Sequence, residues 1–181
     1  YLDIKGEEDE RILKHAFLNS FFQTGLRGNI DEAVIKRAKE KGLQELTSKY
    51  TKIDEIPFDF SRRRLSVIVT DGTKKQMITK GAVEEILNIC TLVDYKGEVS
   101  PLTAEIKQNI KKISKSLNEQ GLRVVAVCQK NDIGEINNFS VKDETKMVLM
   151  GFIGFLDPPK ESAKKAIQRL NKDGIRVMVL T

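Results

Sequence analysis

The chain has 181 residues, of which 40% are hydrophobic and 31% charged, and its formal net charge is +5. This composition is that of a globular domain able to bury a core, and it excludes a disordered chain. Cys90 and Cys128 lack C-x-x-C spacing and His15 is the only histidine, which excludes a disulfide framework and a histidine-based metal cluster. No apolar run approaches the roughly 18 residues of a membrane-spanning helix.

The positive charge alone does not indicate a partner. Many of the lysines fall on the polar face of an expected helix, as do Lys107, Lys111, Lys112 and Lys115. Solvation of that face is the simpler interpretation, although an anionic ligand or nucleic acid stays open.

The first third of the chain has helical periodicity. A first helix is indicated by apolar residues at three- and four-residue steps, namely Ile12, Leu13, Ala16, Phe17 and Phe21. Asn29 and Asp31 can cap a second helix that runs to Gly42, and a short amphipathic piece follows up to Tyr50.

The middle of the chain changes to the period of a strand. Residues 65–70 alternate in a strand pattern, Asp71-Gly72 predicts a hairpin, and the return strand covers residues 76–79. A helix over residues 83–90, a tight turn at Lys96-Gly97 and a long helix from Thr103 to Gly121 follow. The valine-rich residues 122–128 predict a central strand, and a polar loop over residues 131–138 comes next.

The last part reads as half of a parallel strand–helix–strand unit. Strands are expected over residues 148–156 and 175–180, with a helix between them that carries Ala163, Ala166, Ile167 and Leu170. We therefore expect two units, residues 1–147 and residues 148–181, the second of them truncated.

Two short segments could contact a ligand, although neither a G-x-x-x-x-G-K-[ST] nor a G-x-G-x-x-G loop is present. In the segment 57–64, Phe60 can stack on a purine and the arginines that follow suit phosphate oxygens. At a strand-to-helix junction, Lys80 and Gly81 combine a cation with a residue that does not block a ligand. The alternatives are a core aromatic beside surface arginines, and a solvated lysine beside a turn glycine.

In order along the chain, the motifs F-S-R (60–62), K-G-A (80–82), G-L-R-V (121–124) and D-P-P (157–159) resemble those of P-type ion-transporting ATPases. The matching region lies between the phosphorylated aspartate of that family and its later aspartate-bearing loop. The resemblance covers the whole chain. It implies an α+β fold, with an antiparallel twisted sheet flanked by helices as the nucleotide-binding domain. A C-terminal β-α-β stub of the α/β phosphorylation domain is expected after it.

The resemblance also implies the site. Phe60 stacks on adenine, Lys80 with Gly81 lies at the base of the pocket, and Asp31 contacts the edge of the base. Two arginines, Arg62 and Arg123, are expected near the phosphates. The hinge to the phosphorylation domain falls on Asp157, Pro158 and Pro159, for which a rigid loop is the alternative. No metal ligand is expected in the chain.

Finer likeness, as in residues 53–60 and 155–161, is to the bacterial magnesium-transporting members. The implied parent transfers the γ-phosphoryl group of Mg-ATP to an aspartate, a residue that this chain lacks, so the chain is expected to bind ATP without turnover. Its partners are then the phosphorylation, actuator and transmembrane domains. The expected location is the cytoplasmic side of a bacterial plasma membrane, with the fragment itself soluble.

Three alternatives remain open. The ion could be Ca²⁺ or H⁺, because the membrane helices that choose it lie outside this sequence. The cluster Arg62–Arg64 could belong to a basic nucleic-acid-binding module, although no recognisable motif supports one, so no nucleic acid is expected as a partner. An enzyme of the haloacid-dehalogenase type would share only the part from Val148 onward.

Overall fold

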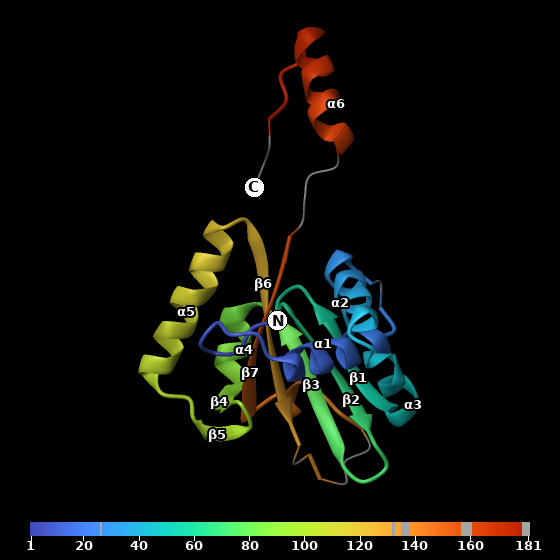
Figure 1. Cartoon of the computed structure of the whole chain (residues 1–181), viewed down its shortest axis with the longest axis vertical. Coiled ribbons are helices and arrows are strands. Elements are labelled where there is room, and N and C mark those ends of the chain that lie inside the picture. Colours follow the sequence, from blue (N-terminus) through green and yellow to red (C-terminus); the bar gives the residue numbers. More distant parts are fainter. Residues whose placement is uncertain (26, 132, 135–137, 157–160, 179–181) are drawn as a thin grey trace.

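The computed structural model describes residues 1–25, 27–131, 133–134, 138–156 and 161–178. They form a seven-stranded twisted sheet with helices on both faces (Figure 1). The sheet consists, in its spatial order, of β1 (Thr51–Asp59), β2 (Arg64–Thr70), β3 (Lys75–Gly81), β6 (Leu122–Lys130), β7 (Met147–Leu156), β4 (Cys90–Tyr95) and β5 (Glu98–Pro101). Neighbouring strands are antiparallel except for the parallel pair β4 and β7. The predicted α+β class is confirmed.

Helices cover the sheet in two groups. One face carries α1 (Glu10–Phe22) and α2 (Asn29–Glu40), and the other carries α4 (Val83–Ile89) and α5 (Ala104–Glu119). The shorter α3 (Leu46–Lys49) follows α2, and α6 (Glu161–Lys172) lies outside the two layers in Figure 1. None of the helices in the described ranges is long and apolar enough to cross a membrane.

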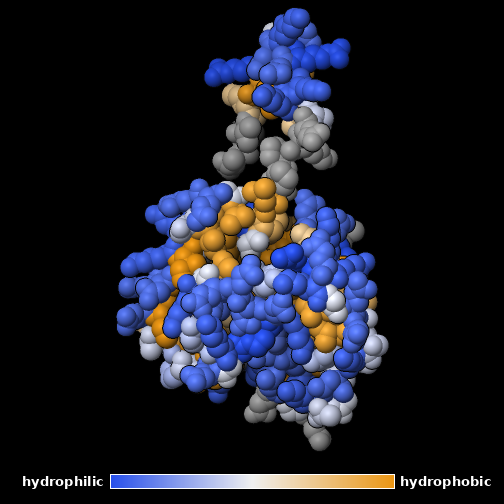
Figure 2. Space-filling view, in the orientation of Figure 1, coloured by the Kyte–Doolittle hydropathy of each residue, from blue (hydrophilic) through white to orange (hydrophobic). Residues whose placement is uncertain are grey.

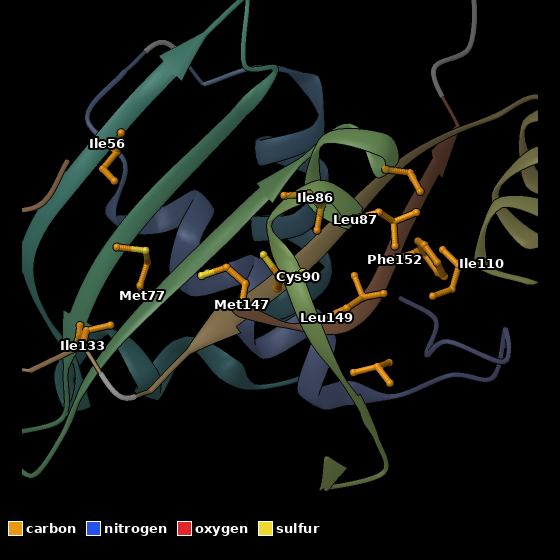
Figure 3. Close-up of a cluster of buried hydrophobic side chains, with 14 of the residues drawn as sticks. Ile56, Met77, Ile86, Leu87, Cys90, Ile110, Ile133, Met147, Leu149 and Phe152 are labelled. Carbon is orange, nitrogen blue, oxygen red and sulfur yellow. The ribbon is translucent and has the colours of Figure 1, made fainter. Parts of the chain in front are cut away.

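The two-residue period of the strands divides the core in two. In β2, Leu65, Val67 and Val69 pack with α1 and α2, whereas Ile68 packs on the opposite side with α4. Figure 3 shows this second core, in which side chains of α4 and α5 lie over β7; the labelled residues include Ile86, Leu87, Ile110, Leu149 and Phe152. Both faces of the central strands are therefore buried, as their near-continuous apolar sequences require.

Three strands were not predicted, and all lie near the edges of the sheet. In β1, most side chains are partly or fully exposed, and its pairing with β2 shifts register between Lys52 and Asp54 and between Ile56 and Asp59. The four residues of β5 are exposed throughout, and β4 joins β5 through the predicted turn at Lys96-Gly97. An edge strand buries few side chains and so leaves a weak alternating pattern.

The C-terminal part differs from the expectation in two respects. β7 pairs with β6 from Val148 to Leu156 and lies inside the sheet, so the sheet does not end at the expected boundary between residues 147 and 148. Residues 175–178 form no strand, which corrects the expected final strand over the part that is described. The expected hinge at Asp157, Pro158 and Pro159 lies outside the described residues, and the division into domains stays a prediction.

A buried carboxylate fixes the segment before β7 to the sheet. Glu144 is 1% exposed and accepts hydrogen bonds from Arg62 Nη1 (3.0 and 2.9 Å), Arg64 Nε (2.8 Å) and Ser66 Oγ (2.6 Å). Ser66 in turn shares a hydrogen bond with Thr79 across β2 and β3 (2.7 Å). Because a buried charge is tolerated only when it is paired and hydrogen-bonded, these contacts hold the β1–β2 turn in one position.

Replacing Glu144 with alanine leaves two guanidinium groups without their buried partner. We expect Glu144→Ala to lower the free energy of unfolding by about 3–5 kcal/mol, measured by urea denaturation. The control is Glu45→Ala, which removes an exposed pair with Lys49 and should cost less than about 1 kcal/mol. Equal effects of the two substitutions would show that the Glu144 network does not stabilise the fold.

Candidate functional site

A pocket of about 230 Å³ opens between the end of α1, the start of α2 and the sheet. Its lining combines apolar and charged side chains, namely Gln23, Ile30, Asp31, Phe58, Arg63, Leu65, Lys80, Gly81, Ala82 and Val125. This is smaller than the roughly 300–1,000 Å³ of sites that enclose a whole drug-sized ligand. It suits one flat ring system rather than a complete nucleotide.

A buried ion pair lies at one side of the pocket. Lys80 is on the same face of β3 as Ile78, and this face is turned toward α1 and α2. Its Nζ donates to Ser20 Oγ (2.7 Å) and to Asp31 Oδ1. Burial lowers the pKa of Lys80, against the opposing effect of the Asp31 carboxylate. Both residues were expected at the site from the family resemblance, and the structure brings them into contact.

Asp31 also caps its own helix. Its Oδ2 accepts a hydrogen bond from the backbone N–H of Gly28 (3.0 Å) at the start of α2. Burial alone would raise the pKa of Asp31, but the Lys80 ammonium and the hydrogen bonds outweigh burial and hold this pKa below its ordinary value. Asp31 is therefore a fixed anion 5% exposed at the edge of the pocket.

The two aromatic residues of the F-D-F segment have different positions. Phe58 lines the pocket, whereas Phe60 does not and is 90% exposed. The rings form an edge-to-face pair with centroids 5.3 Å apart and an angle of 84° between planes. Phe60, not Phe58, was predicted as the ligand-stacking ring, because the local sequence does not reveal whether the ring at the end of β1 or the ring in the following turn faces the pocket.

Gly81 is required by the packing of the backbone as well as by the pocket. A Cβ atom at this position would lie 2.5 Å from the carbonyl oxygen of Arg63 and 2.5 Å from Cβ of Arg64. The neighbouring N–H of Ala82 donates to the same Arg63 carbonyl (3.0 Å). The close approach of β2 to β3 thus accounts for glycine at this place, and the residue also lines the pocket as predicted.

The structure distributes the arginines differently from the prediction. Arg62 pairs with Glu144 and donates through Nη2 to the carbonyl of Pro57 (2.6 Å), so its position does not support contact with a ligand in the pocket. Arg63 lines the pocket instead and pairs with Glu85 (2.7 Å). Arg64 is also held by Glu144. Of the three consecutive arginines, two thus bind the buried Glu144 and the middle one borders the pocket.

Arg123 lies in β6 beside a second, more open hollow of about 370 Å³. This hollow shares Ile30, Ala82 and Val125 with the pocket, so the two adjoin. Figure 2 shows apolar side chains gathered at the upper end of the large body of the molecule, below α6, and the exposed Leu156 ends β7. A ring bound in the pocket can therefore extend a polar chain toward Arg123.

The arrangement suits a planar apolar group with polar edges and an anionic extension. Phe58, Ile30 and Leu65 supply apolar surface, Asp31 and Gln23 supply polar groups at the edge, and arginines lie at two places on the border. No group of three potential metal ligands occurs among the residues for which the structure gives positions. Gln23 did not enter the predicted site, because nothing in its local sequence marks it as buried beside Asp31.

The lowered pKa of Asp31 predicts a pH-dependent stability. The ion pair contributes fully to the free energy of unfolding above the ordinary carboxyl pKa of about 4. This contribution is lost as the pH falls through the lowered pKa of Asp31 in the folded state. We expect Asp31→Asn to be less stable than the wild type by about 3–5 kcal/mol at pH 7, and the difference to shrink at pH 3.

Urea unfolding at both pH values measures this effect, with the exposed Asp173 replaced by asparagine as the control. A difference between wild type and Asp31→Asn that stays constant from pH 7 to pH 3 would contradict the assignment of an ionised, stabilising Asp31.

Comparison with known proteins gives the family. The sequence pattern of the P-type ATPase cytoplasmic domain N matches residues 14–162. The chain is 45% identical over 182 residues to "Magnesium-transporting ATPase, P-type 1" of Escherichia coli (strain K12), and 43% identical to the protein of that name in Salmonella typhimurium (strain 14028s / SGSC 2262). Both matches cover 100% of this chain and 20% of the relative.

A more distant relative is "Calcium-transporting ATPase lmo0841" of Listeria monocytogenes, which is 33% identical over 76% of this chain and 16% of its own length. The chain thus spans about a fifth of the length of the curated relatives it matches. Since the family pattern covers most of the chain, including both helical layers and the pocket, the chain belongs to the P-type ATPases and represents their cytoplasmic domain N.

Proposed function

We propose that this domain binds the adenine of ATP in the pocket beside Lys80 and Asp31 and presents the γ-phosphate to an aspartate outside the chain. The observation that carries the proposal is the buried Lys80–Asp31 pair at the side of an apolar pocket of ring size. A solvated lysine beside a turn glycine, the simpler reading of K-G-A, does not fit a lysine that is 9% exposed.

Adenine enters the pocket with the aliphatic stem of Lys80 and the ring of Phe58 as fixed walls. Phe60, exposed and edge-on to Phe58, is free of core packing and covers the base by stacking. The fixed carboxylate of Asp31 lies against the edge of the base, where it also holds Lys80 in place. These roles agree with the family resemblance and with the chemistry of the lining.

The phosphates extend from the pocket toward the adjoining hollow. Arg123 borders this hollow, and Arg63 borders the pocket with a half-exposed side chain that also pairs with Glu85, which supports a role for both arginines in binding anionic oxygens. Mg²⁺ accompanies the nucleotide as Mg-ATP and is held by phosphate oxygens. Arg62 can take its predicted role only by leaving Glu144, and we assign it to the support of the turn.

The parent protein is proposed to be a P-type ATPase that transports Mg²⁺. The relatives with 45% and 43% identity are named as magnesium transporters, and the relative at 33% is named as a calcium transporter. The phosphorylation, actuator and transmembrane domains are then the partners, reached through the hinge at residues 157–160. The domain lies on the cytoplasmic side of a bacterial plasma membrane. Ca²⁺ or H⁺ transport is the alternative.

Phe60→Ala tests the stacking. We expect a loss of ATP affinity of roughly tenfold or more, since base–aromatic stacking contributes about 1–3 kcal/mol, with unchanged stability because the ring is exposed. Amide shifts near Lys80 and Arg123 during an ATP titration measure the affinity. The control is Val99→Ala on β5, which is 53% exposed. Absence of any shift at millimolar ATP in the wild type would refute the site.

Turnover needs the rest of the parent. The isolated chain with Mg-ATP should release phosphate no faster than the uncatalysed control, whereas vesicles that contain the longer protein should move Mg²⁺ in an ATP-dependent manner. A magnesium-sensitive dye inside the vesicles reports the transport. ATP-dependent transport of Ca²⁺ in place of Mg²⁺ would favour the alternative ion. Hydrolysis of ATP by the isolated chain would contradict the proposal that this domain only binds ATP and that turnover needs the rest of the parent.

A further inference from the structure

Gln23 has an unused hydrogen-bonding group in the pocket. It follows the last turn of α1, where its backbone N–H donates to the carbonyl of Asn19 (3.2 Å). Its side chain is among those that line the pocket, and the residue is only 7% exposed. Nevertheless, its amide nitrogen Nε2 is buried and has no hydrogen-bond partner.

A buried donor without a partner is unusual, because the donor gives up its hydrogen bonds to water and forms no hydrogen bond within the protein to replace them. The neighbouring polar groups do not relieve it. Lys80 is a donor only, and it is already directed at Ser20 and Asp31. Nε2 is near enough to the Asp31 carboxylate to contribute to the lowered pKa of Asp31, yet it makes no hydrogen bond of good geometry there.

We propose that the Gln23 carboxamide recognises the edge of the purine base and selects a 6-amino purine over a 6-oxo purine. The proposal rests on the proposed binding of ATP and adds the residue that determines the choice of base. Nε2 donates to a ring nitrogen of adenine while Oε1 accepts from the 6-amino group. This is the bidentate pairing for which a glutamine side chain is suited.

Asp31 gives this pairing its direction. A carboxamide that is free to rotate by 180° fits adenine and a 6-oxo purine equally, because its donor and acceptor exchange places. The Asp31 carboxylate only accepts hydrogen bonds and lies near enough to the Gln23 side chain to be influenced by it, so it attracts the NH₂ group and disfavours the rotated carboxamide, whose Oε1 would face the carboxylate. A 6-oxo purine then places an acceptor against Oε1 and a donor against Nε2, so both contacts are mismatched.

ATP and ITP test the proposal, because their bases differ only at the 6-position and the protonation of N1. The wild type should bind ATP several-fold more tightly than ITP. Gln23→Met keeps the length and apolar bulk of the side chain but removes both hydrogen-bonding groups. We expect this substitution to lower the affinity for ATP roughly tenfold, within the range for a bidentate pair of about 1–3 kcal/mol. The affinity for ITP should change by no more than about twofold.

Gln120→Met is the matched control, since Gln120 is also the residue at the end of a helix, but it is exposed and lies outside the pocket. It should leave the ratio of ATP to ITP affinity unchanged. Should Gln23→Met fold poorly, Gln23→Asn withdraws the amide by one methylene and should also reduce the ratio toward one.

The possible results separate this proposal from the proposed function. Suppose that the wild type binds ATP, but that Gln23→Met lowers the affinities for ATP and ITP equally or changes neither. Gln23 is then a structural residue, and the recognition of the base edge is refuted. If the wild type binds no nucleotide, the ATP site itself is refuted and the role of Gln23 with it. Calorimetric titration of each nucleotide into the folded chain gives the required ratio.

Discussion

The pocket depends on one buried ion pair. An ammonium group inside a protein must have a carboxylate and further hydrogen bonds, or its desolvation is not compensated. Lys80 satisfies this requirement with Asp31 from α2 and Ser20 from α1, and so it fixes both helices against β3. The position of α2, and with it the width of the pocket, is thereby set by a pair whose partners are far apart in the sequence.

A second buried carboxylate works on the other side of the sheet. Glu144 pairs with Arg62 and Arg64, and Asp31 pairs with Lys80. Each of these two carboxylates therefore fixes the side chains of basic residues in one position. Arg63, between the two arginines bound to Glu144, is left to face the pocket. Its φ of +46° is uncommon outside glycine and reflects the tight turn at which the segment reverses.

The sequence predicts most of the fold where local signals are strong. The β2–β3 hairpin follows from the Asp71-Gly72 turn, and Lys80 lies near the end of β3, just before α4, as the strand-to-helix pattern of its segment indicates. Phe58 and Gln23 could not be recognised in this way. Whether a strand-end ring or a helix-end amide faces a pocket is decided by α1 and α2 packing across the sheet, and no neighbouring residue encodes that contact.

The central place of β7 has a mechanical consequence. Its hydrogen bonds to β6 extend from Val148 to Leu156, while β4 adds a parallel pairing at the opposite end. A pull applied at Leu156 acts along the strand and loads many of these hydrogen bonds at once in shear, instead of opening them one after another. The sheet therefore resists such a pull as one unit, so that a displacement of Leu156 along the strand also displaces β6 and with it Val125 in the wall of the pocket.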